Sequence, residues 1–156
     1  MLYLIRHAKA GSRSRWTGDD RPRPLTDKGE AQAEVLANRL VDVAIGDFVS
    51  SPYLRCVQTI TPLAERRGSE VRVDDRLAEE TGFHGALELL AQLPDGSVLC
   101  SHGDVIPETI AALERRGCRI LTEPDWRKAS VWVLTRDADG RITEAAATPP
   151  PDADDD

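Results

Sequence analysis

Short apolar runs alternate with segments of helical periodicity along most of the chain. Residues 2–5, 48–50 and 98–101 have the length and composition of short strands. The segments between them place apolar residues three or four positions apart, which is the pattern of helices that pack one side against a sheet. The alternation predicts an α/β fold, a single three-layer domain in which helices cover both faces of a mostly parallel sheet.

Residues with a preference for helix ends set the boundaries of two predicted helices. Thr26 can cap a helix that continues to about Leu40. Pro52 suits the first position of a second helix, which Gly68 ends after about Arg67. The other expected elements are helices over residues 86–93 and 106–116, an edge strand over 71–73, and strands over 130–135 and 141–146.

Composition limits the class of protein. A chain of 156 residues with 40% apolar residues is long enough for one domain with its own core. The net charge is −7, and four of the acidic residues belong to the final PPPDADDD. We therefore expect a domain over residues 1–147 and a disordered acidic tail over 148–156. The body of the chain is only mildly acidic, so we expect no nucleic-acid partner.

Cysteines and apolar stretches bear on the cellular environment. The three cysteines show no CxxC spacing, which fits a reducing compartment and gives no zinc signal. No stretch is long and apolar enough to span a membrane, and no secretory signal is visible. We expect a cytoplasmic protein with no membrane partner.

Arginine and histidine side chains follow the predicted strands at their carboxyl ends. Arg6 and His7 follow the first strand, Arg55 lies in the first turn of the helix after the second, and His102 follows the strand over 98–101. The carboxyl ends of parallel strands meet at one edge of a sheet, so these side chains should converge there. Guanidinium groups favour phosphate, and neighbouring cations favour a neutral imidazole with a nucleophilic nitrogen. A structural histidine is the alternative at either position alone.

Other polar and aromatic residues allow two interpretations each. The segment 9–28 concentrates basic side chains, which form either a solvated loop or a rim that attracts phosphate: Lys9, Arg13, Arg15, Arg21, Arg23 and Lys28. Trp16 and Trp126 lie in predicted loops, where an indole either stacks on a ligand ring or covers the edge of the core. We favour the core for both. His84, in the predicted loop 81–85, has no comparable setting.

Five motifs occur in a characteristic order: LIRHA, RPLTDKG, SSPYLRCVQT, RLAEE and CSHGD. With this set the chain resembles the histidine phosphatase superfamily, which has the phosphoglycerate-mutase-like fold. The short length and the RPLT element resemble the compact SixA-type branch. The stretches SSPYLRCVQT and LCSHGDVIP are similar to the phosphatase half of Nudix-linked two-domain proteins, although this chain carries no Nudix signature.

The resemblance implies roles for the residues at the strand ends. His7 would be the nucleophile that takes the phosphoryl group. Arg6 and Arg55 would hold the phosphate oxygens, and His102 would complete the pocket. Arg23, in RPLT, would be a further phosphate ligand.

The resemblance also implies an acidic proton donor after the third strand. Glu79 matches that position, with Glu80 and Asp104 as alternatives. No cofactor is implied. The three histidines show no HxH or HExxH spacing, so we expect no metal, with arginines in place of the cation.

These roles imply a phosphomonoester hydrolase that works through a phosphohistidine on a small phosphorylated metabolite or nucleotide. The alternatives are a protein phosphohistidine phosphatase in signalling, phosphoryl transfer of the phosphoglycerate mutase type, and a phosphate-binding module without turnover. Only residues 56–78 separate Arg55 from the acid, fewer than in the mutases. That leaves little material for a lid, so we favour water as the acceptor.

Overall fold

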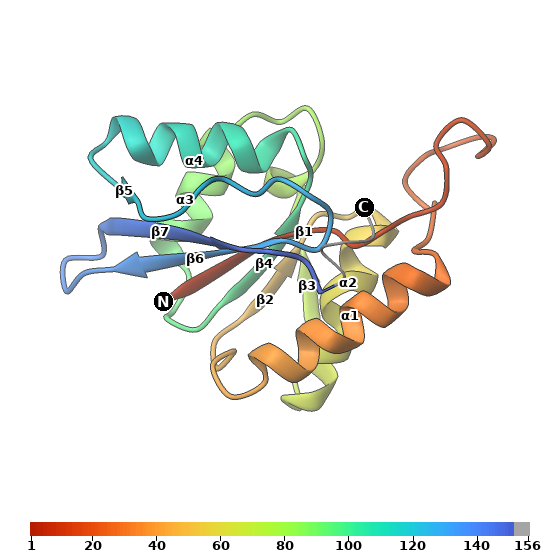
Figure 1. Cartoon of the computed structure of the whole chain (residues 1–156), viewed down its shortest axis with the longest axis horizontal. Coiled ribbons are helices and arrows are strands. Elements are labelled where there is room, and N and C mark those ends of the chain that lie inside the picture. The colour runs from red at the N-terminus through yellow and green to blue at the C-terminus, as the bar shows by residue number, and fades with distance from the viewer. Residues whose placement is uncertain (152–156) are drawn as a thin grey trace.

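Seven strands form one mixed sheet in the computed structural model, which describes residues 1–151 (Figure 1). In chain order the strands are β1 (Leu2–Arg6), β2 (Phe48–Ser50), β3 (Val71–Val73), β4 (Val98–Ser101), β5 (Arg119–Ile120), β6 (Val131–Arg136) and β7 (Ile142–Thr148). The helices of the same region are α1 (Asp27–Leu40), α2 (Leu54–Arg66), the 3₁₀ helix η1 (Asp75–Leu77), α3 (His84–Gln92) and α4 (Val105–Arg115).

The sheet is mostly parallel, as predicted. Its strand order is β3-β2-β4-β1-β6-β7-β5, and the strands from β3 to β1 all run parallel. Strand β6 is antiparallel to both β1 and β7, and β5 is parallel to β7. In the β1–β4 pair Arg6 lies opposite Ser101. The next residues, His7 and His102, therefore leave the sheet side by side.

Helices cover both faces of the sheet, which confirms the predicted three layers (Figure 1). Leu2 and Leu4 of β1 belong to the core cluster that contains the buried sides of α3 and α4. Tyr3 and Ile5 point to the other face and pack with α1 and α2. Alternate side chains of one strand thus fill two cores, which is why β1 is apolar from Leu2 to Ile5.

The start of α1 agrees with the sequence prediction, whereas the start of α2 differs from it. Thr26 caps α1, and its Oγ1 accepts a hydrogen bond from the amide of Gly29 at 3.1 Å. The prediction that Pro52 is the first residue of the second helix is wrong, because α2 begins at Leu54. The amide of Tyr53 donates to Oγ of Ser51 at 3.3 Å, which holds the chain in a turn before the helix begins.

Two smaller boundaries and one short strand also differ from the sequence prediction. Helix α3 begins at His84 rather than at residue 86, because the amide of Leu87 already bonds to the carbonyl of Phe83. Strand β5 was not predicted. Strand β7 ends at Thr148, one residue beyond the predicted domain end. Of the predicted tail, residues 152–156 lie outside the described residues. Within residues 1–151 no helix has the length and apolarity needed to cross a bilayer.

Candidate active site

His7 is a buried imidazole whose protonation is fixed by its surroundings. Nδ1 lies 2.8 Å from the carbonyl oxygen of Ala8. A carbonyl only accepts hydrogen bonds, so Nδ1 carries the proton and Nε2 carries the lone pair. Burial lowers the pKa of His7 well below its usual value, and the charges of His102, Arg55 and Arg6 lower it further. The predicted like-charge effect is present, but burial is the larger cause.

His102 lies next to His7 at the carboxyl end of β4. The two ring centroids are 5.5 Å apart, with an angle of 63° between the ring planes. Nε2 of His102 lies 2.7 Å from Oγ of Ser51. Nδ1 lies 3.3 Å from Oε1 of Glu79, without the alignment of a hydrogen bond. The structure therefore brings the two predicted histidines to one site.

Arg6 reaches the same site from the end of β1. Its Nη1 donates a hydrogen bond to the carbonyl oxygen of Trp126 at 2.6 Å. Gly103, directly after His102, makes room for it: a Cβ atom at position 103 would lie 2.8 Å from Cζ of Arg6. A glycine at this position lets the guanidinium group lie against the main chain.

Arg55 is fully buried in the first turn of α2. Its Nη2 lies 2.5 Å from Oε1 of Glu79 and 3.1 Å from Oδ2 of Asp20. Its Cζ lies 4.7 Å from the centroid of the Tyr53 ring. A buried guanidinium group needs such counter-charges, because an uncompensated ion is costly in a low dielectric.

The three candidate acids differ in what their side chains do. Oε1 of Glu79 accepts hydrogen bonds from Arg55 and from Nη2 of Arg13, the latter at 3.0 Å. Asp104 makes structural hydrogen bonds with both of its carboxylate oxygens. Oδ1 caps α4, and Oδ2 accepts a hydrogen bond from the amide of Glu80 at 2.8 Å. The side chain of Glu80 is exposed. Glu79 is therefore the acid that contacts both Arg55 and His102.

Arg23 joins the site through the long loop that precedes α1. Its side chain is buried, Nε donates to Oδ1 of Asp20 at 2.7 Å, and Nη1 donates to the carbonyl oxygen of Gly11. Asp20, which was not predicted, links Arg23 to Arg55. The available signal was an acidic pair, Asp19 and Asp20, inside an otherwise basic loop.

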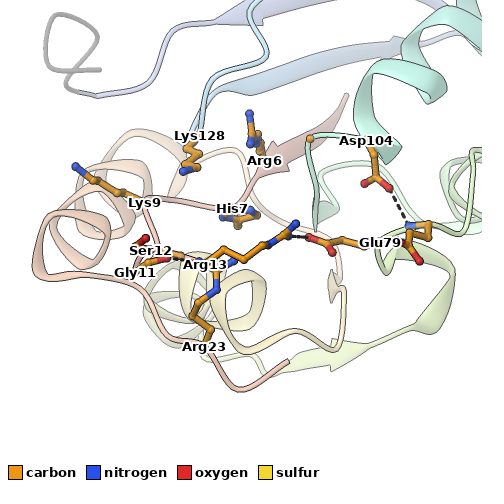
Figure 2. A pocket seen from close by; sticks show the side chains of 13 residues that line it. Arg6, His7, Lys9, Gly11, Ser12, Arg13, Arg23, Glu79, Asp104 and Lys128 are labelled. Carbon is orange, nitrogen blue, oxygen red and sulfur yellow. Dashed lines mark hydrogen bonds and ion pairs between the residues drawn. The ribbon is translucent and has the colours of Figure 1, made fainter. Parts of the chain in front are cut away.

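The site opens into a cavity of about 760 Å³ (Figure 2). His7, Arg6, Arg23 and Glu79 line it, together with Lys9, Ala10, Gly11, Ser12, Arg13, Glu80, Gly103, Asp104 and Lys128. Figure 2 shows Lys9 and Lys128 on the side of His7 away from Glu79 and Asp104. Part of the basic segment 9–28 thus forms a rim of the cavity. Arg15, Arg21 and Lys28 are not among its lining residues.

The preference for the core edge is confirmed for Trp126 and is wrong for Trp16, whose side chain is 38% exposed. Trp126 lies over the buried Trp132, with ring centroids 5.2 Å apart, and so covers the edge of the core. The indole nitrogen of Trp16 donates to the carbonyl oxygen of Asp19 within the loop. His84 stacks on Phe83 at 4.3 Å and lies outside the cavity lining.

These groups can bind a tetrahedral oxyanion beside an imidazole lone pair. Guanidinium groups supply the positive charge, and a carboxyl group lies within reach to move a proton. Among residues 1–151, no three His, Cys, Asp or Glu side chains are grouped so as to hold a metal ion. A parallel sheet with such a site at its carboxyl edge defines a class of protein that binds or transfers phosphoryl groups.

Comparison with known proteins identifies the family. Residues 2–85 match the family model of the histidine phosphatase superfamily (branch 1), and the chain belongs to this superfamily. It is 38% identical over 158 residues to the 8-oxo-(d)GTP phosphatase of Mycolicibacterium smegmatis. That alignment covers 97% of the chain and 48% of the relative, so the chain spans about half the relative's length.

Solved structures confirm the predicted phosphoglycerate-mutase-like fold of the compact SixA-type branch. The protein histidine phosphatase SixA, solved with tungstate, superposes with a TM-score of 0.68 at 22% identity, covering 94% of this chain and 93% of SixA. A mycobacterial glucosyl-3-phosphoglycerate phosphatase superposes with a TM-score of 0.62 at 22% identity, covering 86% of this chain and 92% of that protein.

Proposed function

We propose that the chain is a phosphomonoester hydrolase that works through a phosphohistidine on a small phosphorylated metabolite or nucleotide. The observation that carries the proposal is the state of His7. Its imidazole is buried and neutral, and Nδ1 donates a hydrogen bond to the carbonyl oxygen of Ala8, which leaves the lone pair on Nε2. His7 lines a cavity in which basic side chains outnumber acidic ones. A neutral imidazole beside bound phosphate is a nucleophile for phosphorus.

The reaction proceeds in two displacements. Nε2 of His7 attacks phosphorus while the bond from phosphorus to the leaving oxygen breaks. Glu79, protonated, donates its proton to that oxygen, and the resulting carboxylate then takes a proton from water as water attacks the phosphohistidine. The products are the free alcohol and phosphate, and Nε2 regains its lone pair. Positioned proton transfer of this kind contributes about 10²–10⁴ in rate.

Arginine side chains provide the charge stabilisation in the proposed reaction. Arg6 and Arg55 hold the phosphate oxygens, with Arg23 and His102 completing the pocket. Loss of one such preorganised donor costs about 10²–10³ in rate. This arrangement needs no metal ion, because the guanidinium groups carry the charge that a cation would otherwise supply.

The size of the cavity and the curated relative both support a small-molecule substrate. A volume of about 760 Å³ lies in the range of about 300–1,000 Å³ typical of small-molecule sites. The M. smegmatis relative is an 8-oxo-(d)GTP phosphatase, which favours a nucleotide among the possible substrates. Lys9 and Lys128 on the rim would suit an anionic substrate.

A protein phosphohistidine is the second candidate substrate. The observation that favours it is the fold, which matches SixA, a protein histidine phosphatase, over nearly the whole of both chains. A phosphate carried on a protein surface needs access to His7 rather than enclosure. The two candidate functions are distinguished by which of these substrates releases phosphate faster.

A phosphate-release screen tests the proposal. The substrates are sugar phosphates, nucleoside mono-, di- and triphosphates, and a phosphohistidine protein. His7→Ala serves as the blank, and His84→Ala controls for the loss of an exposed histidine outside the cavity. We expect turnover by the wild type and by His84→Ala, and none by His7→Ala. Equal turnover by His7→Ala would overturn the proposed nucleophile.

A further inference from the structure

Asp20 contacts two buried arginines, Arg23 of the cavity lining and Arg55 behind it, although it belongs to the long surface loop before α1. Its Oδ1 accepts a hydrogen bond from Nε of Arg23 at 2.7 Å. Its Oδ2 lies 3.1 Å from Nη2 of Arg55. Its main-chain carbonyl accepts a further hydrogen bond from Nη1 of Arg55 at 3.2 Å. One residue thus holds two guanidinium groups that come from different parts of the fold.

The charge of Asp20 compensates cations that have little contact with water. The side chain of Arg55 is 0% exposed and that of Arg23 is 7% exposed. Partial burial alone would raise the pKa of Asp20. The hydrogen bond from Arg23 and the charges of Arg55, Arg23 and Arg13 outweigh burial and lower that pKa. Asp20 is therefore ionised at neutral pH and remains a counter-charge for both arginines.

The contacts of Asp20 leave one edge of Arg55 for another anion. Asp20 occupies Nη1 and Nη2 at the end of the guanidinium group. Nε, at its side, is buried and has no hydrogen-bond partner within residues 1–151. Guanidinium groups bind phosphate through two neighbouring N–H groups, and Nε with Nη2 form such a pair. Glu79 now shares Nη2 at 2.5 Å and is the carboxylate that a phosphate oxygen would displace.

Arg13 of the same loop contacts both carboxylates, Glu79 and Asp20. Its Nη2 lies 3.0 Å from Oε1 of Glu79 and 3.7 Å from Oδ2 of Asp20, which are the two oxygens that Arg55 also contacts. Figure 2 shows the Arg13 side chain extending past His7 toward Glu79. Two arginines and two carboxylates thus form a closed ring of ion pairs.

We propose that Asp20 is a positioning residue that orients Arg55 and Arg23 for phosphate and so couples the loop over residues 11–24 to the phosphate pocket. The proposal rests on the proposed function for the identity of its ligand. Without the carboxylate, both guanidinium groups lose one of the contacts that fix their direction. A displacement of about 1 Å at such a site can cost about a hundredfold in rate.

Calorimetric titration with inorganic phosphate tests the role of Asp20 without requiring turnover. The proteins are the wild type, Asp20→Asn, Asp20→Glu, and Asp42→Asn as a matched control on an exposed aspartate after α1. We expect the Kd for phosphate to rise about tenfold to a hundredfold in Asp20→Asn, with a smaller rise in Asp20→Glu and no change in Asp42→Asn. In turnover assays we expect KM to rise and kcat/KM to fall in the same order.

The outcomes separate this proposal from the proposed function. Phosphate binding by Asp20→Asn that equals or exceeds the wild type would show a competing carboxylate and overturn the positioning role. If Asp20→Asn does not fold, Asp20→Glu decides, because an unchanged Kd there overturns the role equally. A wild type that binds no phosphate overturns the inference, whereas one that binds phosphate and hydrolyses no ester overturns only the proposed hydrolysis.

Discussion

The burial of His7 makes the stability of the protein depend on pH in a way that one substitution should remove. The pKa of His7 is well below 6.5 in the folded protein, chiefly because of burial, and close to 6.5 in the unfolded chain. The stability that follows is fully present above pH 6.5. It is lost as the pH falls from 6.5 toward the folded pKa, because the unfolded chain takes up a proton that folded His7 does not.

The magnitude follows from this difference in proton uptake. Each pH unit in that window costs about 1.4 kcal/mol, so the contribution of His7 falls by up to about 2 kcal/mol between pH 7.5 and pH 5.0. His7→Asn removes the titration, while its amide can still donate to the carbonyl of Ala8. Other titrating groups are common to both proteins, so the difference between them isolates His7.

Urea denaturation at several pH values measures the effect. We expect the wild type to lose stability relative to His7→Asn as the pH falls from 7.5 to 5.0, with most of the change below 6.5. His84→Asn controls for the loss of an imidazole from an exposed position. A wild-type-minus-variant difference that stays constant across this range would refute a depressed pKa at His7, and with it the neutral nucleophile.

Three further predictions concern catalysis and phosphate binding. Glu79→Gln should leave slow turnover and accumulate phosphoenzyme, seen as acid-labile label after rapid quenching, and normal turnover would rule out Glu79 as the acid. Gly103→Ala should lower phosphate affinity by about tenfold or more, because the new Cβ would lie 2.8 Å from Cζ of Arg6, and unchanged calorimetric affinity would contradict this. Turnover should survive dialysis against EDTA, and a strict need for Mg²⁺ would count against charge stabilisation by arginine.

The strands that carry the site were predictable because burial leaves a clear mark on their sequences. Strands β1 and β4 are packed on both faces and are therefore apolar nearly throughout. The residues directly after them, His7 and His102, could then be assigned to one edge of the sheet. Strand β5 has two residues, and its pairing with β7 depends on contacts between distant segments. No local pattern encodes such a strand.

Loop geometry explains what the sequence did not reveal about the site. The long loop before α1 follows a path set by contacts with α2 and with the segment after η1, which lie more than 30 residues away. The ion pairs of Asp20 with Arg55 and of Arg13 with Glu79 arise from that path. His7 could be assigned to the site because it directly follows an apolar strand. Asp20 could not, because its contacts with Arg55 are made between segments far apart in the chain.

The hydrogen bond from His7 to Ala8 also determines which chemical isomer a phosphorylated enzyme would contain. With Nδ1 committed as a donor, Nε2 is the nitrogen left to accept phosphorus. Phosphorylation at position 7 would then give the τ regioisomer and exclude the π form. An antibody selective for τ-phosphohistidine would recognise the denatured intermediate, and one selective for the π form would not.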